Sequence, residues 1–442
     1  MPVRSLRRWP TARRLAAGLR RGGSPGPVPK GSRRPARADR AAYADAATID
    51  GRRDARGGPG WAVSVRPRSA ASATGRTASV PVILAAPDKF RGTATAHQAS
   101  EAIARAAWSR GRQARQMPLS DGGEGFIEVL EVLGGQREHV EVTGPLRSPV
   151  EASYLRLGNV AVIEMAQASG LALVGGPGGN DALAATTRGT GELIVSAARA
   201  LARPAPGPAA AGPGAARPAT GNRGQRTVVV GLGGSATTDG GLGALRWIEQ
   251  QGGLGDTELV GACDVTVRFV EAAEGFSRQK GADEMQVVQL EARLRRLAER
   301  YEAEYGIDVG TVPGSGAAGG LGGALVALGG RLRSGFEVVA EMVGFHEAVA
   351  RSSLVVTGEG ALDASSLAGK VVGSAVREAS ASGVPSLVIA GRVSPEASAA
   401  VEALGARVVS LGGRFGEDRA LSDVCGCIET AVAEHLDATG GG

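Results

Sequence analysis

The chain has 442 residues, of which 43% are apolar and only 3% aromatic, with 69 glycines. This composition is typical of a globular protein of two or three domains with a core of small aliphatic side chains. Residues 1–80 carry 18 basic and 4 acidic side chains, so the net charge of +6 leaves −8 for residues 81–442. An acidic folded region argues against nucleic-acid binding. The sequence also lacks an apolar run long enough to span a membrane.

The three cysteines, Cys263, Cys425 and Cys427, are too few for a disulfide framework or a four-ligand zinc site. This usage favours a reducing, cytoplasmic compartment. Residues 1–79 are predicted to be a disordered extension rich in Arg, Pro and Gly, because they contain few large apolar side chains to bury. The first 21 residues superficially resemble an organelle transit peptide. A solvated tail, or translated sequence upstream of the true start, is favoured over a transit peptide because the continuation lacks amphipathic order.

Strand and helix patterns alternate from Val80 onward. Strands are predicted at 82–86, 139–142, 152–157, 160–165, 228–230, 259–264, 354–356, 386–390 and 407–411, and helices at 96–108, 126–133, 186–202, 244–248, 284–304, 321–328, 370–379 and near His435. The Pro/Ala/Gly tract at 203–226 interrupts this alternation as a loop insertion. The alternation indicates parallel βαβ units and therefore an α/β protein.

The stretch from Gly231 to Gly243 follows a predicted strand and leads into a predicted helix. A strand that turns into a helix through glycines leaves backbone N–H groups free to bind an anion. Ser235, Thr237 and Thr238 can add hydroxyl donors, whereas Asp239 repels an anion unless it binds a metal or takes a proton. This combination indicates phosphate chemistry. A glycine-rich turn with Asp239 as a helix cap is the equally weighted alternative.

Other acid-bearing glycine turns follow predicted strands, and ligands of parallel sheets bind at the carboxyl ends of the strands. The sequence therefore predicts that Asp88, Asp121, Asp239 and Glu359 converge on one triphosphate-and-magnesium pocket.

Eight motifs follow one another along the chain: Ala86–Gly92, Asp121–Gly125, Ile163–Gly170, Ala185–Glu192, Gly233–Thr237, Gln279–Ala282, Pro313–Gly320 and Thr357–Gly360. In this order they resemble bacterial-type glycerate kinases, over roughly residues 80 to 436. The resemblance implies phosphorylation of D-glycerate to 2-phosphoglycerate, with ATP and Mg²⁺ as cofactors. The alternative is a catalytically weakened homologue that binds a nucleotide or metabolite, or a kinase of another small hydroxy acid. This alternative is motivated by residues 267–277, which depart from the Asn-Pro-Leu and glycine-rich turn typical of the family.

The resemblance also implies two α/β domains with parallel-rich sheets, the larger one Rossmann-like, and an active-site cleft between them. We expect the larger domain at 80–143 and 290–436, and the inserted domain at 144–289 with a flexible loop at 203–226. A homodimer is an option that the sequence leaves open.

Phosphoryl transfer needs neutralisation of phosphate charge and a group that activates the attacking hydroxyl. Asp239 is the first candidate for this activation, with metal binding and helix capping as alternatives. Asp88 and Lys370 complete the predicted catalytic set. Asp121 and Glu124 are candidates for Mg²⁺ binding, although a turn aspartate and a glutamate favoured by a helix dipole would have the same pattern.

The remaining candidates bind nucleotide or substrate. The nucleotide set consists of Gly233, Gly234, Ser235, Thr237, Gly314, Ser315, Gly316, Glu359 and Asp363. Lys89 or Arg91 is expected to pair with the carboxylate of glycerate, and Gln167 and Ser169 to hydrogen-bond its hydroxyls. Arg392, at another strand end, is a candidate for a phosphate contact. Solvated cations, tight loops and capping residues are the alternatives for these positions.

Overall fold

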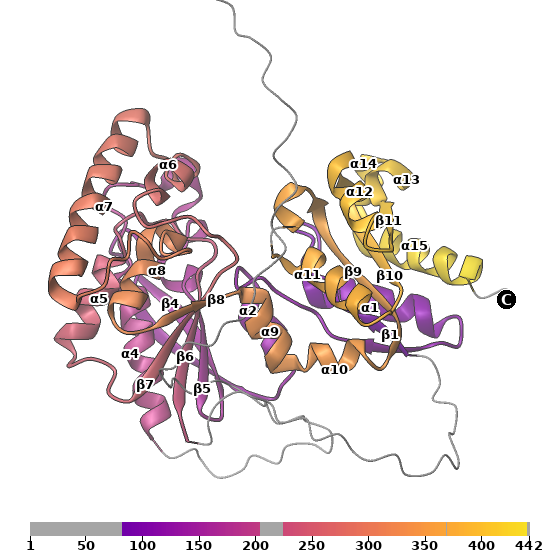
Figure 1. Ribbon diagram of the computed structural model, residues 1–442, viewed down its shortest axis with the longest axis horizontal. Coiled ribbons are helices and arrows are strands. Elements are labelled where there is room, and N and C mark those ends of the chain that lie inside the picture. The colour runs from indigo at the N-terminus through magenta and orange to yellow at the C-terminus, as the bar shows by residue number, and fades with distance from the viewer. Residues whose placement is uncertain (1–81, 204–223, 368, 440–442) are drawn as a thin grey trace, which may run out of the picture. The chain divides into compact units, whose positions relative to one another are not determined.

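The computed structural model describes residues 82–203, 224–367 and 369–439 (Figure 1). The extension expected at 1–79 lies outside the described residues, as does all but the ends of the loop expected at 203–226. Within the described ranges, none of the helices is both long and apolar enough to cross a membrane.

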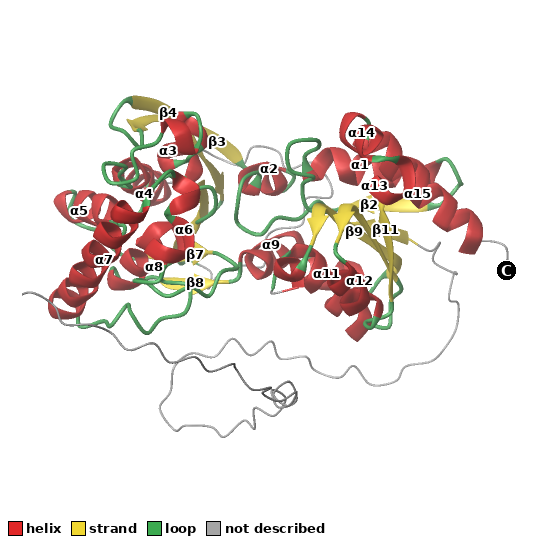
Figure 2. Ribbon diagram, turned by 90° about the horizontal axis from the view of Figure 1, so that it is seen from above, coloured by secondary structure: helices red, strands yellow, loops and turns green. Residues whose placement is uncertain are grey.

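The first sheet has five parallel strands in the order β11-β10-β9-β1-β2. Its strands are β1 (Val82–Ala85), β2 (Gln113–Gln116), β9 (Ser352–Leu362), β10 (Ser386–Val393) and β11 (Ala406–Ser410). Helices cover both faces, as Figure 2 shows. They are α1 (Ala96–Trp108), α13 (Leu411–Phe415), α14 (Glu417–Ser422) and α15 (Val424–Thr439) on one face and α11 (Val371–Ala381) and α12 (Pro395–Glu402) on the other. Because neighbouring side chains of a strand face opposite ways, Ile83 packs with α1 and α15 while Leu84 packs with α11.

The second sheet has six strands in the order β3-β4-β5-β6-β7-β8. Its strands are β3 (Gln136–Thr143), β4 (Pro149–Leu157), β5 (Val160–Glu164), β6 (Arg226–Gly231), β7 (Thr257–Ala262) and β8 (Arg331–Arg333). The sheet is mixed, because β3, β4 and β5 pair antiparallel whereas β5 to β8 pair parallel. The helices that accompany this sheet are α2 (Phe126–Glu131), α3 (Ala166–Ser169), α4 (Arg188–Ala202), α5 (Leu242–Gln250), α6 (Ala272–Phe276), α7 (Glu284–Tyr305), α8 (Ala317–Ala327) and α9 (Gly335–Val343). The next helix, α10 (Phe345–Val349), packs on β9 and α11 of the first sheet.

The α/β class predicted from the sequence is confirmed. Sheet membership does not follow the expected domain boundaries at 143/144 and 289/290, however. β3 lies before the expected insert and β8 lies after it, yet both pair within the six-stranded sheet. Residues 136–333 therefore hold one sheet, and the first sheet is built from the segments on either side.

Two turns expected at strand ends are part of strands. The segment Thr357–Asp363 was expected to turn after a strand, but β9 continues to Leu362 because β10 pairs with it as far as Val393. Gly391 and Arg392 therefore also lie within a strand, β10. Glycine in the middle of β9 permits a close approach, since a Cβ at Gly360 would lie 3.1 Å from the backbone nitrogen of Arg91.

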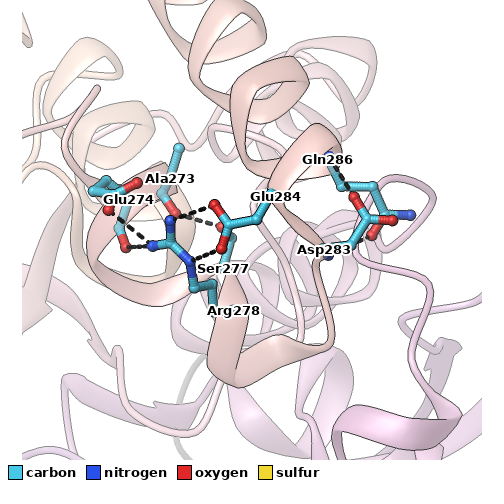
Figure 3. A network of polar contacts seen from close by, with 7 residues as sticks. All are labelled: Ala273, Glu274, Ser277, Arg278, Asp283, Glu284 and Gln286. Carbon is cyan, nitrogen blue, oxygen red and sulfur yellow. Dashed lines mark hydrogen bonds and ion pairs between the residues drawn. The ribbon is translucent and has the colours of Figure 1, made fainter.

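The segment 267–277, which departs from the family pattern, is firmly packed. Phe269 is fully buried and stacks edge-on against Tyr301. Arg278 then links two helices, with its guanidinium 2.9 Å from carboxylate oxygens of both Glu274 and Glu284 (Figure 3). At the start of α7, Asp283 and Gln286 form a reciprocal capping box.

The two longest glycine-rich turns, 231–243 and 313–320, pack against each other, backbone on backbone. Gly240 N–H donates to the Gly319 carbonyl at 3.0 Å. A Cβ on Gly319 would clash with the Thr237 carbonyl oxygen, and Gly319 has a φ of +66°. Glycines are thus required here by packing.

We expect Gly319→Ala to lower the free energy of unfolding by about 3 kcal/mol or more, because it adds a steric clash to left-handed backbone strain. The matched control is Gly252→Ala, where φ is +85° but no atom lies within 4 Å of the added Cβ. This control should cost only about 1 kcal/mol. Urea denaturation of both variants measures the difference, and equal losses would contradict the packing argument.

Candidate functional site

Two neighbouring cavities lie at the carboxyl ends of the central strands of the first sheet. The Glu359 cavity, of about 390 Å³, is lined by Asp88, Lys89, Asp121, Glu359, Lys370 and Arg392 among others. The Ser120 cavity, of about 330 Å³, is lined by Asp88, Lys89, Arg91, Ser120, Glu124 and Glu128 among others. The loop after β1 contributes residues to the walls of both cavities, so the cavities are adjacent.

A lysine lies between two carboxylates in the shared wall. The Lys89 Nζ is 3.6 Å from Asp88 Oδ1 and 3.8 Å from Asp121 Oδ1. Burial raises the pKa of Asp88 to about 6, against the opposing effect of Lys89 and with a further increase from Asp121. The backbone holds Asp88 in place, since its N–H donates to the Gly358 carbonyl at 2.8 Å. Asp88 is therefore poised to exchange a proton near neutral pH.

Glu359 contributes a partly buried carboxylate from the middle of β9. Burial raises its pKa to about 7, with a contribution from Asp88, while Ser366 and Lys370 oppose the increase. Its Oε1 atom is buried and has no hydrogen-bond partner among the described residues. Buried polar atoms in native proteins nearly always have partners, so this oxygen is available to accept from a ligand or to bind a cation.

The end of β9 and the start of α11 bring Asp363 and Lys370 to the same cavity. Hydrogen bonds from Ser365 lower the pKa of Asp363. Lys370 precedes α11 as its N-cap residue, and its Nζ donates to the Ser365 Oγ at 2.9 Å. Because the Ser365 N–H also donates to the Asp363 Oδ1 at 2.8 Å, Ser365 connects the carboxylate of Asp363 to the ammonium group of Lys370.

Asp264, which sequence reasoning did not select, supports this site from the second sheet. Its carboxylate accepts hydrogen bonds from Gly335 N–H at 2.9 Å and Phe336 N–H at 3.3 Å at the start of α9. Burial raises its pKa to about 6, and Asp121 adds to the increase. Asp264 closes a predicted strand, the same signal that led to Asp121 and Asp239.

Asp239 lies elsewhere, and it lines neither of the two cavities. Its buried carboxylate accepts hydrogen bonds from the backbone N–H and hydroxyl of Thr187, both at 2.9 Å, and from Gly241 and Gly243 N–H at 3.1 and 3.2 Å. These donors tie the start of α4 to the start of α5. The geometry is that of the capping alternative. The structure therefore brings Asp88, Asp121 and Glu359 to the Glu359 cavity, whose lining does not include Asp239.

Near Asp239, a fully buried lysine occupies the glycine-rich region. The Lys280 Nζ donates to the Thr237 carbonyl at 2.7 Å. Burial lowers the pKa of Lys280 to about 7, partly offset by Asp239. This contact joins the Gln279–Ala282 motif to the Gly231–Gly243 turn.

The other predicted residues are found in varied surroundings. Gln167 accepts from Ser153 and donates to Glu164, and the Ser169 hydroxyl is paired with that of Thr190. Neither Gln167 nor Ser169 lines either cavity.

The predicted metal pair is divided, with Asp121 on the Glu359 cavity and the exposed Glu124 on the Ser120 cavity. Arg392 lines the Glu359 cavity but pairs with Glu417 at 2.8 Å.

The glycine turns predicted to bind nucleotide also pack tightly. A Cβ on Gly233 would lie 2.5 Å from the Gly123 Cα, so this turn abuts the Asp121 turn. Gly316 N–H donates to the Val267 carbonyl at 2.9 Å. Neither cavity is lined by the residues of these turns that were predicted to bind nucleotide, namely Gly233, Gly234, Ser235, Thr237, Gly314, Ser315 and Gly316. Among the described residues, no group of three or more His, Cys, Asp or Glu side chains is arranged to hold a metal ion.

A family model described as the glycerate kinase family matches residues 83–250 and 248–434 of this chain. A glycerate kinase of Halalkalibacterium halodurans is 35% identical over 347 residues, covering 70% of this chain and 85% of the relative. A glycerate 2-kinase of Escherichia coli is 35% identical over 326 residues, covering 65% of this chain and 79% of the relative.

An uncharacterised protein of Mycobacterium bovis is 40% identical over 333 residues, covering 72% of this chain and 80% of the relative. A crystal structure described as that of a candidate glycerate kinase 2 from Salmonella typhimurium LT2 superposes with a TM-score of 0.63 at 28% identity. This likeness covers 82% of this chain and 99% of the other.

The raised pKa of Glu359 predicts how stability depends on pH. The folded protein keeps the Glu359 proton up to a pH of about 7, whereas the unfolded chain releases it near the ordinary glutamate pKa of 4.5. Between these values the folded state binds more protons, so this group's contribution to the free energy of unfolding falls as pH rises. From pH 5 to pH 8 the wild type should therefore lose stability relative to Glu359→Gln, by on the order of 2 kcal/mol. Denaturation at both pH values tests this, and parallel pH profiles would refute it.

Proposed function

Because this chain belongs to the glycerate kinase family, we propose that it transfers the γ-phosphoryl group of ATP to D-glycerate, yielding 2-phosphoglycerate. The family and its relatives named glycerate kinase make the chain a phosphotransferase with glycerate as its acceptor. The choice of ATP as donor, of Mg²⁺ as metal and of the 2-hydroxyl as the attacking group is our proposal.

The observation that carries the proposal is the position of Asp88. Among the described residues it is the one carboxylate that lines both cavities. Donor and acceptor must meet in line for phosphoryl transfer, and a wall shared by two cavities is where they can meet. A general base works best with a pKa near the operating pH, and burial raises the pKa of Asp88 to about 6. In this proposal Asp88 accepts the proton of the attacking hydroxyl.

Cations for the phosphates come from two segments of the Glu359 cavity. Lys89 extends from the shared wall, and Lys370 stands at the start of α11. An ammonium group near transferring phosphate offsets the charge that develops in the transition state. We assign Lys89 to the transferred group and Lys370 to the nucleotide phosphates.

The carboxylates of the Glu359 cavity fit a magnesium ion. Asp121 and Glu359 offer hard oxygen ligands. Among the described residues, no hydrogen-bond donor contacts the Oε1 atom of Glu359, so this oxygen is available to the ion. Mg²⁺ held by these two carboxylates would neutralise the charge of the donor phosphates. Glu124, on the other cavity, is left out of this set.

Asp239 has a positioning role in this proposal. Its hydrogen bonds fix the turn whose glycines abut the Asp121–Gly123 turn. Gly233, which abuts Gly123, then acts by setting the backbone position of Asp121. The segment at 267–277 contributes no residue to either cavity, so its divergence gives no support to a loss of catalysis.

We expect Asp88→Asn to lower kcat with D-glycerate and ATP by about 100-fold or more, since an amide cannot accept the hydroxyl proton. Coupled release of ADP provides the assay. The control is Asp437→Asn, which removes an exposed carboxylate that pairs with Arg110 at 2.7 Å, and it should change kcat less than twofold.

Phosphorus NMR of the product distinguishes the 2-phosphate from the 3-phosphate. A wild-type chain that releases no ADP with D-glycerate would contradict the proposed function. A fully active Asp88→Asn variant would contradict only the role of Asp88.

A further inference from the structure

Buried hydroxyls and carboxylates without partners gather at the same edge of the first sheet. Among the described residues they include Ser120 Oγ, Thr357 Oγ1 and Glu359 Oε1. Ser120 is 1% exposed and Thr357 is fully buried. Glu359 lines one cavity and Ser120 the other, whereas Thr357 lines neither. The Ser120 hydroxyl has no part in the phosphate and base assignments above.

Ser120 is held beside the proposed base. Leu119 N–H donates to the Pro87 carbonyl at 2.9 Å, so the chain after β2 runs parallel to the chain after β1. Pro87 immediately precedes Asp88 and Leu119 immediately precedes Ser120. Continued beyond Ala85 and Gln116, the register of the two strands places Leu119 opposite Asp88, and Ser120 follows one residue later.

The two cavities differ in the chemistry of their walls. The Glu359 cavity holds the groups suited to polyphosphate and magnesium, namely Lys370, Asp121 and Glu359. The Ser120 cavity lacks these three residues. It combines the Ser120 hydroxyl with the apolar side chains of Leu119 and Val129, and it shares Arg91 with the Glu359 cavity.

The second set matches a small hydroxy acid. A guanidinium pairs with a carboxylate more strongly than a neutral donor does. In the described part of the chain, no ion pair engages Arg91, so its charge is available. A buried hydroxyl can then hydrogen-bond a hydroxyl of the ligand, and the apolar side chains limit its size.

We propose that the Ser120 cavity is the acceptor subsite, in which Arg91 pairs with the carboxylate of a 2-hydroxy acid and Ser120 hydrogen-bonds one of its hydroxyls. This assignment rests on the proposed function. It places the acceptor on one side of the loop at 88–93 and the nucleotide on the other, with Asp88 between them. Ser120 then determines how tightly the acceptor binds.

The test compares two variants that each remove a buried hydroxyl without a partner. In Ser120→Ala the KM for D-glycerate should rise about five- to tenfold, which is the loss of one hydrogen bond to the ligand. The KM for ATP should stay within twofold. In the matched control, Thr357→Val, both KM values should stay within twofold, because Thr357 lines neither cavity.

Folding should not obscure the result. Removing a buried hydroxyl that has no partner is neutral or stabilising, so the thermal midpoints of both variants should equal or exceed that of the wild type. Isothermal titration of D-glycerate into the wild type and Ser120→Ala provides a readout that does not need turnover, with the same weakening expected.

Each outcome is decisive. A wild type that turns over D-glycerate, combined with a Ser120→Ala variant whose glycerate KM and affinity are unchanged, overturns the subsite and leaves the proposed function intact. If Ser120→Ala raises the KM for ATP and not that for D-glycerate, the Ser120 cavity binds the nucleotide, and this result also overturns the proposed acceptor subsite. A wild type that binds D-glycerate without turnover defeats the proposed function, while the titration still decides the subsite. A wild type that neither binds nor turns over D-glycerate defeats both.

Discussion

Backbone packing at one turn determines the position of the site's carboxylates. A Cβ on Gly231 would lie 2.5 Å from the Gly122 carbonyl oxygen, and one on Gly335 would clash with the Asp121 carbonyl. A Cβ on Gly122 itself would lie 2.8 Å from the carbonyl of Ala262. Strand ends and a helix start of the six-stranded sheet therefore meet the turn that follows β2 of the five-stranded sheet. Because no side chain fits between them, Asp121 is held within 3.8 Å of Lys89.

The electrostatics of the site follow from that crowding. Burial and mutual repulsion raise the pKa values of Asp88 and Glu359 to about 6 and about 7, and the pKa of Asp264 is raised in the same way. Lys89 offsets only part of this repulsion. A concentration of carboxylates with raised pKa values is common at functional sites, where a cation or a transferred proton relieves the repulsion. The groups that repel one another here are therefore suited to binding a cation and to proton transfer.

The sequence predicted most elements of the fold, because apolar periodicity and glycine turns are local signals. The helix at 96–108 begins and ends as expected, with Thr95 as its cap. The role of Asp239 could not be predicted in this way, since its donor Thr187 lies 52 positions earlier in the chain. Strand pairing also depends on partners that are distant in the sequence, so it could not be predicted either. The strand β9 extends through an expected turn only because β10 lies beside it. Ser120 carries no motif of its own, and only its burial without a partner reveals it.

The continuity of β9 has a consequence for ligand binding. Glu359 pairs with Ala390 of β10, and the preceding Gly358 accepts a hydrogen bond from Asp88 N–H. Its main chain is therefore already ordered before any ligand arrives. Ordering a loop on binding would consume conformational entropy and weaken affinity, whereas a side chain mounted on a paired strand loses only rotamer freedom. Glu359 therefore forms part of a rigid acidic wall of the Glu359 cavity.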